Sequence, residues 1–299
     1  MSRCFFEEAC KPVVTEESTG WLPDPLRRTA LCIADKLTKP MDRTIVTIAS
    51  KGFDVLLRQL VESLKRTQKY EHRLCLILLD DDEQCLAVAR HYEMDVIRAK
   101  HLVKPGPGSK SGLYACPHLI ESKQFLCLDA DIIVYESLEH IFKQLDTAVN
   151  PVFMVRDLNE PNSLLKELTD CYKSSYDEVR RCMPGIKRRA WTGTNCNDGL
   201  FAGTKEAILK ADRLMRRWAV SNWLQHPRCC WRNQGVWNLA VHSACDPIYG
   251  RDTDNVQLHV GPGVTWENNK PFFKGEPVSV IHFVGASKTR HKADQRLPE

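Results

Sequence analysis

The feature that most constrains the fold of this chain is the stretch QFLCLDADIIVY at residues 124–135. Two apolar runs of strand length, Phe125–Leu128 and Ile132–Val134, enclose Asp129 and Asp131. Such runs are typical of a strand that is buried on both faces, as in the centre of a parallel sheet. The sequence therefore predicts a central buried strand with two carboxylates at its carboxyl end.

These two aspartates predict a site for a hard divalent metal ion. Carboxylates one residue apart repel each other unless a cation lies between them. Mn²⁺ and Mg²⁺ prefer oxygen ligands, and ligands of open α/β sheets bind outside the carboxyl ends of the strands. The alternative is that both aspartates only cap the following turn, because D-x-D tripeptides also occur by chance.

Composition and charge exclude several classes of protein. The chain has 299 residues, 43% of them hydrophobic and 27% charged, which is enough to bury a large core. Its formal charge of +4 is small and its basic residues are dispersed, so no nucleic-acid partner is predicted. We expect no membrane span, since no apolar stretch reaches about 20 residues. The first eight residues lack a signal-peptide core, which favours a cytoplasmic protein.

The thirteen cysteines favour free thiols over a disulfide framework. Their number is odd, and the chain contains no C-x-x-C motif. A chain of this length does not need disulfides for stability. Cys75 and Cys127 fall within apolar strands, where cysteine is typical as a small buried hydrophobe.

The order of the predicted elements indicates an α/β fold. Residues 1–40 are expected to form an N-terminal extension with one amphipathic helix. From residue 41 onward, strands alternate with helices in the manner of a mostly parallel sheet. We expect one main domain, 41–299, with a nucleotide-binding half at about 41–145 and an acceptor and sugar half at about 146–299. Strands are predicted at 45–49, 74–79, 95–98, 125–128, 152–155, 200–202 and 278–283, and helices at 54–67, 83–92, 111–122, 135–144, 205–218 and 236–241. A turn is predicted at Asn197–Gly199, directly before the strand at 200–202.

Two motifs before the D-x-D strand suggest phosphate or metal binding. The acidic run Asp80–Asp82 could form a second metal site, but it is more typical of the first turn of the next helix. Residues 106–111 read GPGSKS and fail the phosphate-loop frame GxxxxGK[ST], because Ser109 replaces a glycine. Lys110 nevertheless opens the helix that leads into the D-x-D strand, so we expect a cation beside the acidic pair.

Six motifs follow one another between Thr44 and Arg290. They are IVTIAS, Lys110 ahead of LYAC, FLCLDADIIV, NDGLFAG, NQGVWN and IHFVGASK. In this order they resemble the glycogenin-like glycosyltransferases of family 8. The resemblance implies a GT-A fold, with a Rossmann-like, mostly parallel central sheet flanked by helices. It also implies a metal-dependent hexosyltransferase that moves a sugar from a UDP-sugar to an acceptor hydroxyl with retention of configuration.

The same resemblance implies roles for the charged residues. Asp129, Asp131 and His282 would hold Mn²⁺ or Mg²⁺. Lys110 and Lys288 would bind the phosphates of the donor, and Asp129 would also belong to the donor-binding set. A metal ion and two lysines would stabilise the negative charge that develops on a diphosphate leaving group.

Further roles concern the sugar and the nucleoside of the donor. Gln234 is the candidate for the face of the anomeric carbon opposite the diphosphate, and Asp198 is the candidate that orients sugar hydroxyls. Asn197 would also lie near the sugar, and Asp157 would contact a hydroxyl. The pocket for the base and ribose would be lined by Ala49, Ser50 and Phe53.

Three departures from the family pattern leave other functions open. Asn233 stands where an aspartate is common, Asp198 stands where a small residue is usual, and Thr289-Arg290 replaces Pro-Trp. A nucleotide-sugar binding protein with lost or altered catalysis is one alternative. A sugar nucleotidyltransferase is another, although only Ser50-Lys51-Gly52 follows the first strand where that class has a glycine-rich loop. The donor sugar, the acceptor and association into a homo-oligomer are not specified by the sequence.

Overall fold

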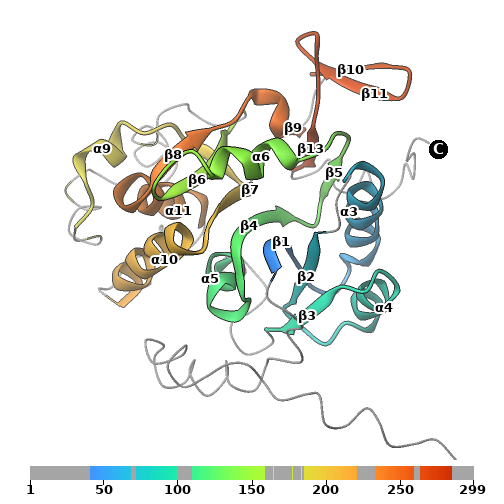
Figure 1. Cartoon of the computed structure of the whole chain (residues 1–299), viewed down its shortest axis with the longest axis horizontal. Coiled ribbons are helices and arrows are strands. Elements are labelled where there is room, and N and C mark those ends of the chain that lie inside the picture. Colours follow the sequence, from blue (N-terminus) through green and yellow to red (C-terminus); the bar gives the residue numbers. More distant parts are fainter. Residues whose placement is uncertain are drawn as a thin grey trace, which may run out of the picture.

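A computed structural model describes residues 41–68, 72–99, 110–158, 185–220, 233–258 and 263–284, together with residues 164, 177 and 183 (Figure 1). The predicted N-terminal helix, most of the GPGSKS segment and Lys288 lie outside these ranges. The side chain of Asn233 is likewise not described.

The mostly parallel central sheet that the sequence predicts is present (Figure 1), and it has seven strands. The seventh is β8, which was not predicted, whereas the strand predicted at 278–283 lies in a separate small sheet. Strands β1, β2, β3 and β4 are mutually parallel, and β6 and β8 are parallel to each other. Strand β7 is antiparallel to both of its neighbours, β4 and β6. The sheet is therefore mixed but mostly parallel. Its spatial order is β3 (Asp95–Arg98), β2 (Arg73–Leu78), β1 (Met41–Ala49), β4 (Ser122–Asp129), β7 (Cys196–Thr204), β6 (Pro151–Arg156) and β8 (Asp246–Tyr249).

Helices cover both faces of this sheet because its central strands are apolar on both sides. In β4, Phe125 and Cys127 pack into one core cluster, while Leu126 and Leu128 pack into another on the opposite face. The first face is covered by α5 (Ser111–Leu119), α9 (Arg188–Trp191), α10 (Lys205–Val220) and α11 (Asn233–Ala244). The second face is covered by α3 (Asp54–Thr67), α4 (Glu83–His91) and α6 (Glu139–Leu145).

A small second sheet continues from the D-x-D stretch. Strand β5 (Ile132–Val134) leaves the main sheet and pairs antiparallel with β13 (Val280–Phe283), which pairs parallel with β9 (Val256–Leu258). In this register His282 lies opposite Ile132. The second sheet therefore brings a histidine from near the end of the chain beside the two aspartates.

The remaining elements were not predicted from the sequence. A short 3₁₀ helix, η4 (Asp252–Asp254), precedes β9. A hairpin of β10 (Val264–Glu267), β11 (Lys270–Phe273) and the short β12 (Glu276–Pro277) projects from the body of the protein (Figure 1). None of the helices described is both long and apolar enough to cross a lipid bilayer.

Two predictions of local structure are wrong. Asn197–Gly199 was expected to be a turn before a strand, but it lies inside β7. These residues instead form an irregularity in the pairing of β7 with β6. Met154 pairs with Phe201, but the next residue, Val155, pairs with Asn197. The helix expected from Tyr135 begins only at Glu139, because the backbone N–H of Tyr135 donates to the carbonyl of Ser279 and extends the edge of β5.

Other local predictions are confirmed. The side chain of Asp82 accepts a hydrogen bond from the backbone N–H of Cys85 at the start of α4, so the acidic run serves as the N-terminus of a helix. Cys75 and Cys127 are free and fully buried.

Candidate metal and nucleotide-sugar site

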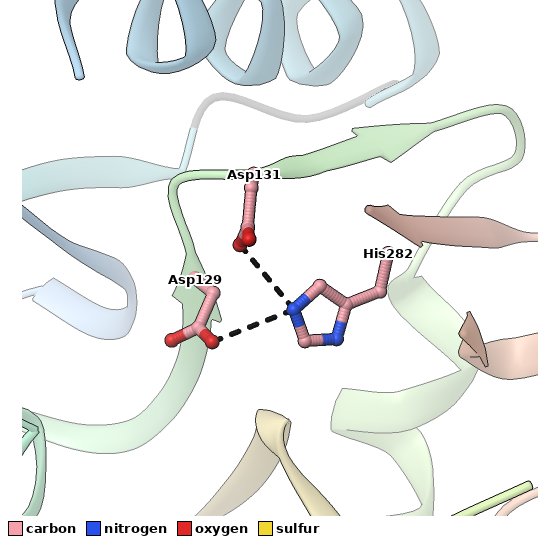
Figure 2. Close-up of side chains that lie close together, drawn as sticks. All are labelled: Asp129, Asp131 and His282. Atoms are coloured by element: carbon pink, nitrogen blue, oxygen red, sulfur yellow. Dashed lines mark ion pairs between the residues drawn. The ribbon is translucent and has the colours of Figure 1, made fainter. Parts of the chain in front are cut away.

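Asp129, Asp131 and His282 meet at the carboxyl edge of the main sheet (Figure 2). Asp129 is the last residue of β4, Asp131 precedes β5, and His282 lies in β13. One ligand atom from each residue lies within 4.8 Å of the others, and His282 Nε2 is 3.3 Å from Asp131 Oδ1. Within the residues described, no other group of three acidic, histidine or cysteine side chains converges in this way. Two carboxylates and an imidazole are a donor set that fits a divalent ion such as Mn²⁺.

The orientation of His282 is fixed by Asn197. The side-chain carbonyl Oδ1 of Asn197 lies 3.0 Å from His282 Nδ1, and it also accepts from the N–H of Gly199 and from Asn255 Nδ2. Because a carbonyl oxygen can only accept, Nδ1 carries a proton and Nε2 is directed at the aspartates. Asn197 therefore holds the imidazole in the orientation that a metal ligand needs.

Gly199 makes room for this ring. A Cβ atom built on Gly199 would lie 2.1 Å from His282 Cε1 and 2.6 Å from His282 Nδ1. The backbone of Gly199 does not have a positive φ, so its role here is to allow close approach. The glycine inside β7 thus has a packing reason that belongs to the site.

The ionisation of the site reflects its burial and its charges. Burial by itself would lower the pKa of His282, but the charge of Asp131 and hydrogen bonds to both aspartates raise it to about 9. Burial would raise the pKa of Asp129, but Lys110 and His282 outweigh burial and hold that pKa well below its ordinary value. A protonated His282 thus neutralises part of the acidic pair that a metal ion would otherwise neutralise.

A pH-dependent affinity for metal follows from this arrangement. Since Nε2 must lose its proton to bind a metal ion, the affinity for Mn²⁺ should rise by about tenfold per pH unit up to pH values near 9. Electron paramagnetic resonance of free Mn²⁺ at about pH 6.5 and about pH 8.5 measures this. His282→Gln should bind weakly at both values, with a much smaller change. An affinity of the wild type that does not change with pH would contradict the assignment of His282.

Lys110 places its ammonium group beside the acidic pair, as predicted. Its Nζ lies 2.8 Å from Asp129 Oδ2 and 2.6 Å from Asp198 Oδ1. Burial opposes the charge, but the two carboxylates raise the pKa of Lys110 well above its ordinary value. The second oxygen of Asp198 accepts a hydrogen bond of 2.7 Å from the hydroxyl of Tyr114.

The predicted sugar-site residues also come together. Gln234, in the first turn of α11, donates to Asp157 Oδ2 at 2.8 Å. Asn197 Nδ2 lies 3.4 Å from both Asp157 Oδ2 and Gln234 Oε1. Asn197 also contacts His282, so it connects Gln234 and Asp157 to the metal cluster. The structure therefore joins these residues and the charged group in one hydrogen-bonded network.

The residues proposed for the nucleoside lie at the neighbouring strand end. Ile48 is in register with Asp129, so Ala49, the last residue of β1, and Ser50 directly after it lie at the same edge of the sheet. Phe53 directly precedes α3, and its N–H donates to the carbonyl of Ser50.

Three residues of the network were not identified from the sequence. Tyr114 lies within the LYAC motif, but no role was assigned to it. Asn255 is fully buried after η4 and donates to Asn197. Asn238 lies one helical turn after Gln234, and its amide exchanges hydrogen bonds with the backbone N–H and C=O of Cys196. Of these three, only Asn238 could have been identified from the sequence, because its i+4 spacing places it on the same face of the helix as Gln234.

Comparisons with known proteins agree with this architecture. The sequence matches no protein-family model and no curated protein. Among solved structures, the bifunctional glycosyltransferase WbbM is 12% identical over 84% of this chain, with a TM-score of 0.55, and this chain spans only 47% of its length.

Two other structures are similar over nearly their whole length. The galactosyltransferase LgtC, solved with donor and acceptor sugar analogues, is 14% identical over 81% of this chain and 87% of its own, with a TM-score of 0.52. Mouse xyloside xylosyltransferase 1 in its apo form is 14% identical over 81% of this chain and 97% of its own, with the same TM-score. The chain therefore has the GT-A fold of these glycosyltransferase structures over most of its length.

Proposed function

We propose that this protein is a metal-dependent glycosyltransferase that moves a hexosyl group from a UDP-sugar to an acceptor hydroxyl. The observation that carries the proposal is the convergence of Asp129, Asp131 and His282 beside Lys110, at the carboxyl edge of a GT-A sheet. This is the edge at which open α/β sheets bind their ligands. The residues that would bind the metal ion therefore lie next to the lysine that would bind the phosphates.

The charged residues would serve the leaving group. In the reaction, the acceptor oxygen forms a bond to the anomeric carbon and the bond between that carbon and the phosphate oxygen breaks. The diphosphate leaves with the bonding electrons and takes up the proton of the acceptor hydroxyl. A divalent ion held by the two aspartates and His282 would act as a Lewis acid on that diphosphate. Lys110 would donate charge-assisted hydrogen bonds to the same phosphates. Lys288 is proposed for a similar role.

The amide and carboxylate network would serve the sugar. Gln234 and Asp157 hold each other in place at 2.8 Å, so both are ordered before a donor arrives. The amide oxygen of Gln234 would stabilise the oxocarbenium-like anomeric carbon, and Asp157 would accept from a sugar hydroxyl. Asn197 links this pair to His282 and so keeps the sugar and metal residues in one arrangement.

The carboxylates of the site support retention of configuration. An inverting enzyme needs a carboxylate base that is directed at the acceptor hydroxyl. Both oxygens of Asp198 are bonded inside the protein, to Lys110 and Tyr114. Asp157 Oδ2 accepts from Gln234 and Asn197. Asp198, with both oxygens engaged, is therefore not arranged as a base for a substrate proton, and Asp157 is assigned to the sugar hydroxyl.

The test is nucleotide release from a panel of UDP- and GDP-sugars, with and without Mn²⁺, compared with a Lys110→Met variant. We expect slow, Mn²⁺-dependent release of UDP from one donor even without an acceptor. Release that does not depend on metal would contradict the proposal. Mn²⁺-dependent binding of UDP without release from any donor, also in the presence of acceptor candidates, would instead favour a nucleotide-sugar binding protein. Formation of a UDP-sugar from UTP and a sugar phosphate would favour a nucleotidyltransferase.

A further inference from the structure

Lys110 forms ion pairs with two carboxylates, and only one of them, Asp129, belongs to the metal cluster. Its ammonium group has three N–H donors. The contacts to Asp129 and Asp198 use two of them, and about a quarter of the lysine side chain is exposed. One donor can therefore be directed toward a ligand at the edge of the sheet.

Asp198 is held in place by contacts on the side away from Lys110. Tyr114, which is 1% exposed, donates its hydroxyl hydrogen to Asp198 Oδ2. The ring of Tyr114 stacks on Trp237 of α11, with centroids 4.5 Å apart and planes at 7°. The backbone N–H of Asp198 also lies 3.4 Å from Gln234 Oε1. The carboxylate is thus fixed relative to α5 and α11 by groups that belong to the core.

The two partners of Lys110 differ in what else they do. Asp129 belongs to the group that fits a metal ion, so a bound ion and Lys110 would share this carboxylate. Asp198 is not a member of that group, and its side chain is 6% exposed. A buried carboxylate is costly unless it is paired, and here the pairing is supplied by the lysine and the tyrosine hydroxyl.

We infer that Asp198 and Tyr114 are positioning residues that hold the Lys110 ammonium for the diphosphate of a nucleotide. Asp198 then acts on the donor through Lys110 and does not contact the sugar itself. The inference rests on the proposed function, because it takes Lys110 to be a phosphate ligand. It assigns a purpose to the carboxylate in the NDG motif.

The effect of each substitution follows from this chain of contacts. Asp198→Asn keeps the size of the side chain but removes the charge that holds Lys110, so the affinity for UDP with Mn²⁺ should fall by about tenfold. Tyr114→Phe removes only the support behind Asp198, so we expect a smaller loss of about threefold. The affinity for Mn²⁺ alone should not change, because neither residue belongs to the metal cluster.

The deciding experiment is a double-mutant cycle on UDP affinity, measured by calorimetry with saturating Mn²⁺. Its members are Lys110→Met, Asp198→Asn and the two combined. If Asp198 acts through Lys110, the double variant should bind UDP no more weakly than Lys110→Met alone. If the two losses multiply, Asp198 acts on the nucleotide independently and the inference is wrong.

Tyr92→Phe is a matched control for Tyr114→Phe. Tyr92 also donates its hydroxyl to a carboxylate, Glu62, at 2.7 Å, but on the α3–α4 side of the sheet. It should leave UDP affinity unchanged, while Tyr114→Phe lowers it. An equal loss in both variants would show a general effect of stability and would overturn the positioning role.

The failure of the inference can be told apart from the failure of the proposed function. A wild type that does not bind UDP with Mn²⁺ would overturn both. Multiplied losses in the double-mutant cycle would overturn the inference alone.

Discussion

Asp131→Asn is expected to abolish metal-dependent transfer while the protein stays folded. Asp131 is 2% exposed, and its carboxylate lies 3.3 Å from His282 Nε2. An amide offers no negative charge to a divalent ion. Removal of a residue that only hydrogen-bonds to a metal ligand typically lowers metal affinity by about 10- to 100-fold. Loss of a ligand itself should therefore weaken Mn²⁺ binding by at least about 100-fold.

The stability of this variant should change little by comparison. Asparagine removes both the repulsion with Asp129 and the attraction to His282, and these effects oppose each other. We expect the free energy of unfolding to change by about 1 kcal/mol. Asp42→Asn is the control, since Asp42 is exposed on β1 and pairs with Lys123 outside the site. Mn²⁺ affinity measured by electron paramagnetic resonance should fall only in Asp131→Asn, and an unchanged affinity would refute the metal site.

Gly199→Ala should damage both the fold and the site, although it adds a single methyl group. The new Cβ would lie 2.1 Å from the ring of His282 and 2.9 Å from Asn197 Oδ1, so one of these groups has to move. Forced overpacking of this kind should cost about 3 kcal/mol of unfolding free energy. Displacement of His282 should in addition lower the affinity for Mn²⁺ by at least about tenfold.

The control separates the steric effect from a general loss of stability. Gly275, in the turn after β11, has a φ of +83° and no atom within 4 Å of a built Cβ. Gly275→Ala should therefore cost about 1–2 kcal/mol through backbone strain alone. Chemical denaturation should show both variants to be destabilised, but the Mn²⁺ affinity should fall only for Gly199→Ala. Equal metal affinities in the two variants would count against the packing role of Gly199.

The central sheet and the charged site could be predicted because their signals are local. The apolar runs around the D-x-D tripeptide specify a buried strand, and a strand end places Asp129 at the ligand-binding edge. His282 and Lys110 were placed there through ordered motifs, and the structure brings both within ion-pair distance of Asp129.

The supporting contacts could not be predicted because they depend on register between distant segments. The expected turn at Asn197–Gly199 became part of β7, since β6 pairs with Cys196 and Asn197 and β4 pairs from Leu200 onward, so the sheet holds the backbone on both sides of this segment. The same register places Asp198 against Tyr114, which is 84 residues away in the sequence. Asn255 is likewise separated from Asn197 by 58 residues, and no pattern around it indicates burial.

The position of β13 has a consequence for how the site forms during synthesis. Asp131 and His282 are about 150 residues apart, and β13 enters its sheet between β5 and β9. Closing so long a segment is entropically costly and occurs late in folding. A nascent chain that has already folded its N-terminal strands would still lack the histidine ligand. We expect tight metal capture to begin only after β13 has left the ribosome, so a chain truncated before His282 would not sequester the ion.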